Sequence, residues 1–159
     1  MAIIEFQHVG KVYSNAAGKN AEALKDVSLK IEKGEFVYIV GPNGSGKSTL
    51  VKLMICEERL TSGHITVNGY DLTRIKQRQI PYLRRTIGMV FQDFRLIDNM
   101  TVYDNVAFAL RVTGCSAREI RKRVPYALDL MGLVSKARCY PRELSGGEQQ
   151  RTSLARALA

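Results

Sequence analysis

The stretch that organises this sequence is Gly41-Pro42-Asn43-Gly44-Ser45-Gly46-Lys47-Ser48-Thr49. It fits the pattern G-x-x-x-x-G-K-[ST] of a phosphate-binding loop. The apolar run before it, residues 36–40, predicts a buried strand of a parallel sheet, and residues 50–55 after it can continue as a helix. The glycines let the backbone approach a ligand closely, and the amides at the start of that helix then point at a phosphate chain. The stretch therefore predicts binding of a nucleoside triphosphate.

Two side chains of this loop carry chemistry of their own. Lys47 is expected to reach the β- and γ-phosphates, and the Ser48 hydroxyl is expected to ligate Mg²⁺. A glycine-rich turn that binds nothing is the alternative, and the strand and helix expected on either side argue against it. The candidate nucleotide contacts are the whole loop: Gly41, Pro42, Asn43, Gly44, Ser45, Gly46, Lys47, Ser48 and Thr49.

The composition is that of a soluble globular domain. The chain has 159 residues, of which 45% are hydrophobic and 25% charged, and no apolar run is long enough to span a bilayer. Three widely spaced cysteines without a C-x-x-C pair argue for reduced thiols in a cytosolic compartment and against a zinc site. The net charge of +9 is compatible with nucleic acid, with an anionic membrane surface, with plain solvation or with balancing acidic residues expected beyond residue 159. The basic stretch 73–85 is expected to be a solvated face.

Alternating apolar residues and turn signals predict an antiparallel element at the N-terminus, followed by the nucleotide core. The expected strands are residues 3–9 (extended to 13), 24–31, 36–40, 64–67 and 87–91, with a hairpin loop at 14–22. Asn68-Gly69 is a strong hairpin dipeptide, so it is expected to close the strand 64–67. From residue 101 the pattern becomes helical: Thr101 is a candidate N-cap, and Ser116 with Glu119 forms a capping box.

A second motif, residues 144–150 with the sequence Leu-Ser-Gly-Gly-Glu-Gln-Gln, opens the last predicted helix. Ser145 and Glu148 form another capping box, and Gly146 and Gly147 leave the first amides of the helix uncovered as a second anion site. A well-capped helix with no further role is the alternative. The motif resembles the signature of the ABC-type ATPases.

The resemblance implies roles for residues outside the phosphate-binding loop. Tyr13 resembles the aromatic residue that stacks on adenine, and Gln92 is similar to the glutamine that contacts Mg²⁺ and the attacking water. The signature residues resemble those that bind the nucleotide held by the opposite subunit: Ser145, Gly146, Gly147 and Glu148. The implied active unit is a head-to-tail homodimer with ATP and Mg²⁺ between the two chains.

The stretches 57–63, 91–97, 101–108 and 144–151 are similar to the FtsE family of cell-division ATPases. This resemblance implies an FtsX-like integral membrane partner and a position at the cytoplasmic face of the cell membrane. The loop 93–100 is the expected docking place of that partner, with Phe94 and Leu96 as candidate contacts, and an ordinary core role for these two side chains is the alternative. The ATPase of a lipoprotein-release or macrolide-type exporter is an alternative. A soluble ABC protein acting on nucleic acid is another, but no RNA-binding arm or coiled-coil insertion is visible, so no specific nucleic acid is expected.

The implied fold is α/β: a P-loop NTPase core with a parallel sheet, an N-terminal antiparallel β subdomain and a helical signature subdomain. Residues 1–159 are expected to form one ABC ATPase domain, with the P-loop core in 1–92 and a mainly helical part in 93–159. The family pattern continues with Walker B carboxylates and a switch histidine, which nothing in this sequence matches, since His8 and His64 stand too early. We therefore expect the C-terminal part of the core to be missing, assign no catalytic carboxylate, and expect these residues alone to hydrolyse ATP poorly.

Overall fold

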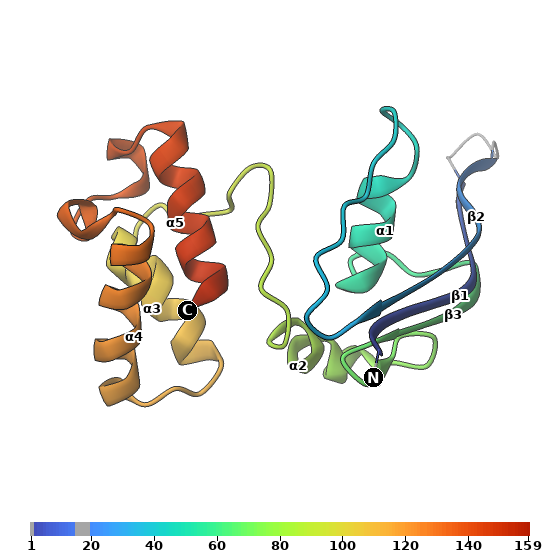
Figure 1. Ribbon diagram of the computed structural model, residues 1–159, viewed down its shortest axis with the longest axis horizontal. Coiled ribbons are helices and arrows are strands. Elements are labelled where there is room, and N and C mark those ends of the chain that lie inside the picture. Colours follow the sequence, from blue (N-terminus) through green and yellow to red (C-terminus); the bar gives the residue numbers. More distant parts are fainter. Residues whose placement is uncertain (1, 15–19) are drawn as a thin grey trace. The chain divides into compact units, whose positions relative to one another are not determined.

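The computed structural model describes residues 2–14 and 20–159, in two compact units, Met1–Thr86 and Ile87–Ala159 (Figure 1). The first unit holds the sheet, the phosphate-binding loop and the basic stretch. The second unit is helical and contains Gln92 and the signature motif. Most of the hairpin loop expected at 14–22 lies outside the described residues.

The sheet of the first unit is antiparallel and has the strand order β2-β1-β3-β4. Its strands are β1 (Ala2–Ser14), β2 (Asn20–Glu32), β3 (Ser62–Val67) and β4 (Tyr70–Asp71). Phe6 of β1 lies opposite Leu29 on one side and Ile65 on the other, and its side chain is buried. Asn68 and Gly69 both have positive φ, as a two-residue hairpin turn between β3 and β4 requires. The predicted N-terminal antiparallel element is confirmed.

Helix α1 (Lys47–Met54) follows the phosphate-binding loop and buries Leu50 and Leu53. The basic stretch forms a 3₁₀ turn, η1 (Gln77–Gln79), and the short helix α2 (Ile80–Arg84). Its aliphatic residues are buried, as is Leu72 just before it, and its basic residues are exposed together with Tyr82, as expected of a solvated face. The buried residues are Leu72, Ile75, Ile80 and Leu83, and the exposed ones are Arg74, Lys76, Arg78, Arg84 and Arg85.

Three helices build the core of the second unit: α3 (Val102–Val112), α4 (Ala117–Leu130) and α5 (Gly146–Leu158), with 3₁₀ turns η2 (Val134–Lys136) and η3 (Pro141–Glu143) between α4 and α5. Val106, Val124 and Ala155, one from each helix, are fully or almost fully buried in a common cluster. The predicted caps are confirmed, since Thr101 and Ser116 each accept a hydrogen bond from the amide three residues on.

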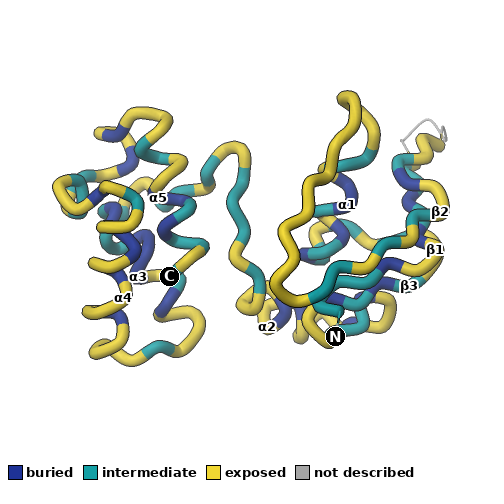
Figure 2. Tube along the Cα trace, viewed as in Figure 1, coloured by how far each residue is buried: buried dark blue, intermediate teal, exposed yellow. Residues whose placement is uncertain are grey.

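The predicted parallel sheet is not observed among residues 2–14 and 20–159. Residues 36–40 and 87–91 were expected to be strands, and the structure assigns no strand to either segment. A strand needs a backbone partner as well as suitable side chains, and no segment among residues 2–14 and 20–159 pairs with either run. The trace before α1 is accordingly exposed (Figure 2), with Phe36 at 81% and Val40 at 85%. The prediction of these two strands was therefore wrong for the residues described.

Candidate functional site

The phosphate-binding loop has a left-handed backbone, which favours glycine, at several positions. Gly41, Gly44 and Gly46 have φ values of 153°, 82° and 88°. A Cβ on Gly46 would also overlap the carbonyl oxygen of Ala23 and lie 2.7 Å from Cδ2 of Leu24. The loop thus turns tightly against β2, and the sequence pattern has a steric cause in this chain.

Helix α1 begins without a side-chain cap. Gly46 is the N-cap residue, the first turn holds no acidic residue, and the first intrahelical bond runs from the Leu50 amide to the Gly46 carbonyl at 2.9 Å. The amides ahead of that bond have no partner within the helix, and the positive end of the helix dipole lies there. This arrangement favours an anion.

Lys47 extends along the loop rather than away from it. Its Nζ donates to the carbonyl oxygens of Gly41 at 2.8 Å and Pro42 at 2.7 Å, and lies 3.4 Å from Oγ of Ser45. A single flexible ammonium is therefore held beside the open amides, where it adds a full positive charge to the helix end. Ser48 is exposed in the first turn of α1, so its hydroxyl can take an oxygen-ligand role.

Tyr13 lies close to the phosphate-binding loop. Its hydroxyl comes within 3.5 Å of Oγ1 of Thr49, a buried residue of α1. One face of the Tyr13 ring is taken by the ammonium of Lys11, 4.6 Å from the ring centroid. Lys11 is itself buried and pairs with Glu58 at 2.9 Å. The structure thus brings Tyr13 beside the loop, and the stacking of its ring on adenine stays a prediction.

In the second unit Gln92 occupies the corner of a turn. The Phe94 amide donates to the Phe91 carbonyl at 3.0 Å, which closes a turn whose central residues are Gln92 and Asp93. The Gln92 side chain is exposed. An exposed amide on a tight turn is free to contact a ligand, and its role toward water and Mg²⁺ stays a prediction.

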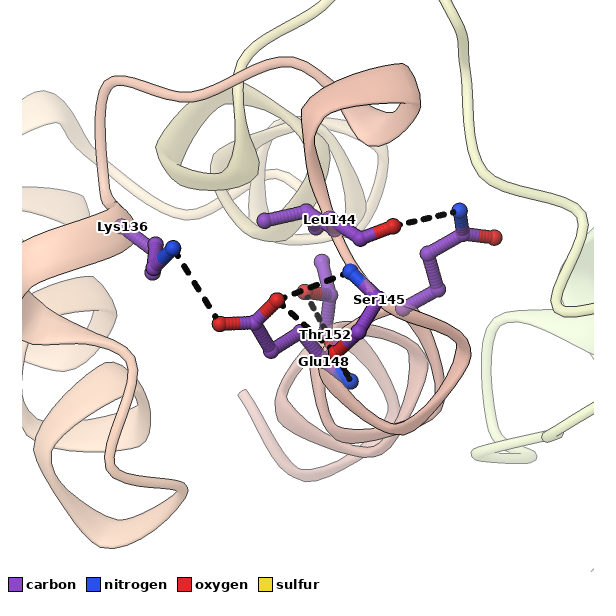
Figure 3. Close-up of polar contacts among 6 residues, drawn as sticks. Lys136, Leu144, Ser145, Glu148 and Thr152 are labelled. Atoms are coloured by element: carbon purple, nitrogen blue, oxygen red, sulfur yellow. Dashed lines mark hydrogen bonds and ion pairs between the residues drawn. The ribbon is translucent and has the colours of Figure 1, made fainter.

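The start of α5 is closed by the predicted capping box (Figure 3). The Ser145 amide donates to Oε2 of Glu148 at 2.8 Å, and the Glu148 amide donates back to Oγ of Ser145 at 3.4 Å. Lys136 lies 3.3 Å from the other carboxylate oxygen. The hydrogen bonds from Ser145 and the Lys136 charge hold the pKa of Glu148 below its ordinary value. One oxygen of Glu148 therefore closes the helix start and the other pairs with Lys136, and the contact of Glu148 with nucleotide stays a prediction.

Gly146 and Gly147 have no internal reason to be glycine. Neither has a positive φ. A Cβ on Gly146 would meet nothing within 4 Å, and one on Gly147 would make only ordinary contact with Arg151 at 3.6 Å. Glycine in a helix costs up to about 1 kcal/mol relative to alanine. The fold therefore does not require glycine at either position, and the predicted contact of this helix start with nucleotide stays a prediction.

Comparison with known proteins identifies the family. The sequence profile described as ABC transporter matches residues 24–159. The chain belongs to the ABC transporter family. It is 51% identical over 156 residues to the cell division ATP-binding protein FtsE of Bacillus subtilis, and 47% identical over 158 residues to that of Streptococcus pneumoniae strain D39. The alignments cover 98% and 99% of this chain and 67% of each relative, so the ABC transporter chain described here spans about two thirds of their length.

Solved ABC cassettes have the same fold. The dimeric structure of MJ0796, a bacterial ABC transporter cassette, matches with a TM-score of 0.90 at 38% identity, over 98% of this chain and 69% of that one. A dimeric post-hydrolysis state of MJ0796 bound to ADP and Pi matches with a TM-score of 0.89 at 37% identity and the same coverage. The expected resemblance to ABC ATPases, and within them to FtsE, is confirmed. The nucleotide of such a cassette is ATP or ADP.

Three side chains near these ABC transporter motifs were not singled out from sequence: Lys11, Lys136 and Arg156. Lys11 stands two residues before Tyr13 on the same strand, a spacing that places both on one face and could have suggested the contact. Lys136 and Arg156 carry no such local signal. No helix of residues 2–14 and 20–159 has the length and apolar character that crossing a membrane demands.

Proposed function

We propose that this chain is the ATP-binding subunit of an FtsE-like membrane complex that binds MgATP at the phosphate-binding loop. The single observation that carries this is the loop itself: left-handed glycines, an uncapped helix start and the Lys47 ammonium held beside it. These features favour a polyphosphate over other anions because they combine backbone donors with a positive charge. The names of the relatives supply the adenine nucleotide and the division role.

Mg²⁺ fits this proposal as a phosphate-bound ion. Among residues 2–14 and 20–159 there is no group of three or more His, Cys, Asp or Glu side chains that could hold a metal alone. Mg²⁺ is commonly held by one or two protein oxygens together with substrate phosphates and waters. Ser48 supplies one such oxygen in the first unit, and the metal role expected of Gln92, a residue of the second unit, stays a prediction. When bound, the ion would neutralise charge on the phosphates.

The homodimer is proposed from the signature end of α5. Gly146 and Gly147 leave that surface bare without benefit to the fold, and MJ0796 forms dimers. In the proposed assembly Ser145, Gly146, Gly147 and Glu148 of one chain approach the nucleotide held by the phosphate-binding loop of the other. The dimer would couple ATP hydrolysis to an FtsX-like integral membrane protein at the cytoplasmic face of the membrane. The general base of that hydrolysis would be a carboxylate that none of the motifs in this sequence provides.

The decisive experiment is nucleotide binding by the Lys47→Ala variant, measured with a fluorescent ATP analogue and Mg²⁺. The variant would lose the two charge-assisted hydrogen bonds proposed between Lys47 and the phosphates. Their loss costs about 3 kcal/mol of binding free energy, so the Kd for the ATP analogue should rise about a hundredfold. Lys52→Ala is the matched control, because Lys52 is an exposed lysine of the same helix. Equal Kd values for the two variants would refute the phosphate role of Lys47.

The membrane role is tested separately by co-purification from detergent-solubilised cells. The FtsE-like proposal expects one small integral membrane protein of division, whereas an exporter ATPase would bring down a transporter subunit. Salt-sensitive retention of RNA or DNA without a membrane protein would instead support the nucleic-acid alternative.

A further inference from the structure

The turn that carries Gln92 continues into a strained backbone. Phe94 and Arg95 have φ values of 56° and 43°, two consecutive non-glycine residues in the left-handed region. L-residues avoid that region because Cβ approaches the following carbonyl oxygen. The Arg95 amide donates to the Asp93 carbonyl at 2.6 Å, so the chain is tightly folded directly after Gln92. Such a conformation persists only where other groups hold it.

Helix α5 supplies those groups. The guanidinium of Arg156 donates from Nη1 to the Arg95 carbonyl at 2.6 Å and from Nη2 to the Phe94 carbonyl at 2.8 Å. The hydroxyl of Ser153, a fully buried residue one turn earlier, donates to the same Phe94 carbonyl at 3.2 Å. Both strained residues therefore have their carbonyl oxygens bound by one helix.

The far end of the same loop is held by α3. Asn105, fully buried, accepts from the Ile97 amide at 2.8 Å and donates to the carbonyl oxygens of Ile97 and Met100, each at 3.1 Å. The segment 93–101 is thus anchored at both ends to the helical unit. Only the Arg156 end adjoins Gln92.

We propose that Arg156 is the positioning residue of the Gln92 turn: its guanidinium fixes the left-handed Phe94–Arg95 backbone to α5, so that Gln92 and the Ser145 end of α5 move as one body. This deepens the proposed function and rests on it, since Gln92 and Ser145 are there the two nucleotide-sensing points of the helical unit. The two hydrogen bonds from Arg156 to Phe94 and Arg95, here called the Arg156 clamp, join these two points through helix α5.

The chemistry at this position requires an arginine. Two carbonyl oxygens on successive residues match the planar fork of a guanidinium, which donates two parallel hydrogen bonds, whereas lysine offers a single point charge. Among the described residues the structure gives Arg156 no carboxylate partner, so its charge is satisfied by backbone dipoles. Burial also lowers the pKa of Arg156 from its ordinary value, in keeping with a guanidinium drawn into the protein.

The test compares Arg156→Gln and Arg156→Lys with Arg121→Gln, a control that removes an exposed arginine of α4. Amide hydrogen exchange of the peptide 93–100 should accelerate about tenfold or more in Arg156→Gln and less in Arg156→Lys, while peptides of α4 exchange as before. Spin labels at Gln92→Cys and Gln150→Cys, in a background with the native cysteines replaced by serine, should show a narrow distance distribution that broadens in Arg156→Gln.

Unchanged exchange at 93–100 in a folded Arg156→Gln protein would overturn the proposal. So would an equal acceleration throughout the helical unit, which indicates general destabilisation, or an unbroadened label distance. If Arg156→Gln does not fold, the same measurements on Arg156→Lys decide. If the parent protein binds no nucleotide, the proposed function is refuted. The hydrogen-exchange and spin-label results would still test whether Arg156 holds the Gln92 turn.

Discussion

Two helices of this chain begin with glycine-rich motifs, and they begin in opposite ways. Helix α1 has no side-chain cap, and its glycines are demanded by the backbone: Gly46 has a φ of 88° and no space for a Cβ. Helix α5 is closed by the Ser145 capping box, and Gly146 is free of either constraint. The first motif therefore shapes a site out of open amides and a lysine. The second motif leaves no side chain at Gly146 and Gly147, on a helix start whose hydrogen bonds are made by Ser145 and Glu148. Such a surface suits contact with a ligand that another chain binds.

The largest expected difference between the two motifs comes from adding one methyl group to each. Gly46→Ala should destabilise the first unit by about 3 kcal/mol, since the left-handed backbone costs about 1–2 kcal/mol and overpacking costs a similar amount. Gly146→Ala should change stability by less than about 1 kcal/mol, in the stabilising direction. Denaturant unfolding of both variants measures the contrast, and equal tolerance at the two positions would remove it.

A smaller effect is expected from removing N-cap side chains, and it distinguishes a loss of stability from a loss of dimerisation at α5. Ser145→Ala and Ser116→Ala each delete the N-cap of a capping box, and each should cost about 1 kcal/mol of stability. Only Ser145 belongs to the proposed dimer surface, so only Ser145→Ala should weaken ATP-dependent dimerisation, measured by sedimentation with MgATP. A matching loss in Ser116→Ala would show that the defect is one of stability.

The features that could be predicted from sequence are those that depend on residues close together in the chain. The capping boxes at Ser116 and Ser145 and the Asn68-Gly69 turn depend on residues within four positions of one another, and all are present. The strands at 36–40 and 87–91 depend on neighbours that local β propensity cannot supply, and they are absent. The contact of Arg156 with Phe94 spans 62 residues, so no spacing rule could have revealed it.

The same reasoning applies to the site. The loop residues 41–49 are contiguous and form one motif, whereas the contact of Tyr13 with Thr49 of α1 joins residues 36 apart in sequence. Their predicted contacts with nucleotide remain to be measured. The ion pairs of Lys11 with Glu58 and of Lys136 with Glu148 arise from tertiary packing, because each lysine pairs with a carboxylate outside its own element.

The smallest effect is a pH dependence that arises at α5 and has no counterpart at the uncapped α1. The pKa of Glu148 lies below the ordinary glutamate value of 4.5, so its stabilising effect is complete above that value and disappears as pH falls through the lower folded-state pKa. Glu119, in the other capping box, behaves alike because of its hydrogen bonds from Ser116. Denaturant midpoints of the helical unit between pH 6 and pH 3 should therefore fall less steeply in Glu148→Gln than in the parent, and least in the double variant with Glu119→Gln. Parallel curves for all three proteins would mean that these carboxylates bind protons equally in the folded and unfolded chains, and the capping boxes would then contribute no charge-dependent stability.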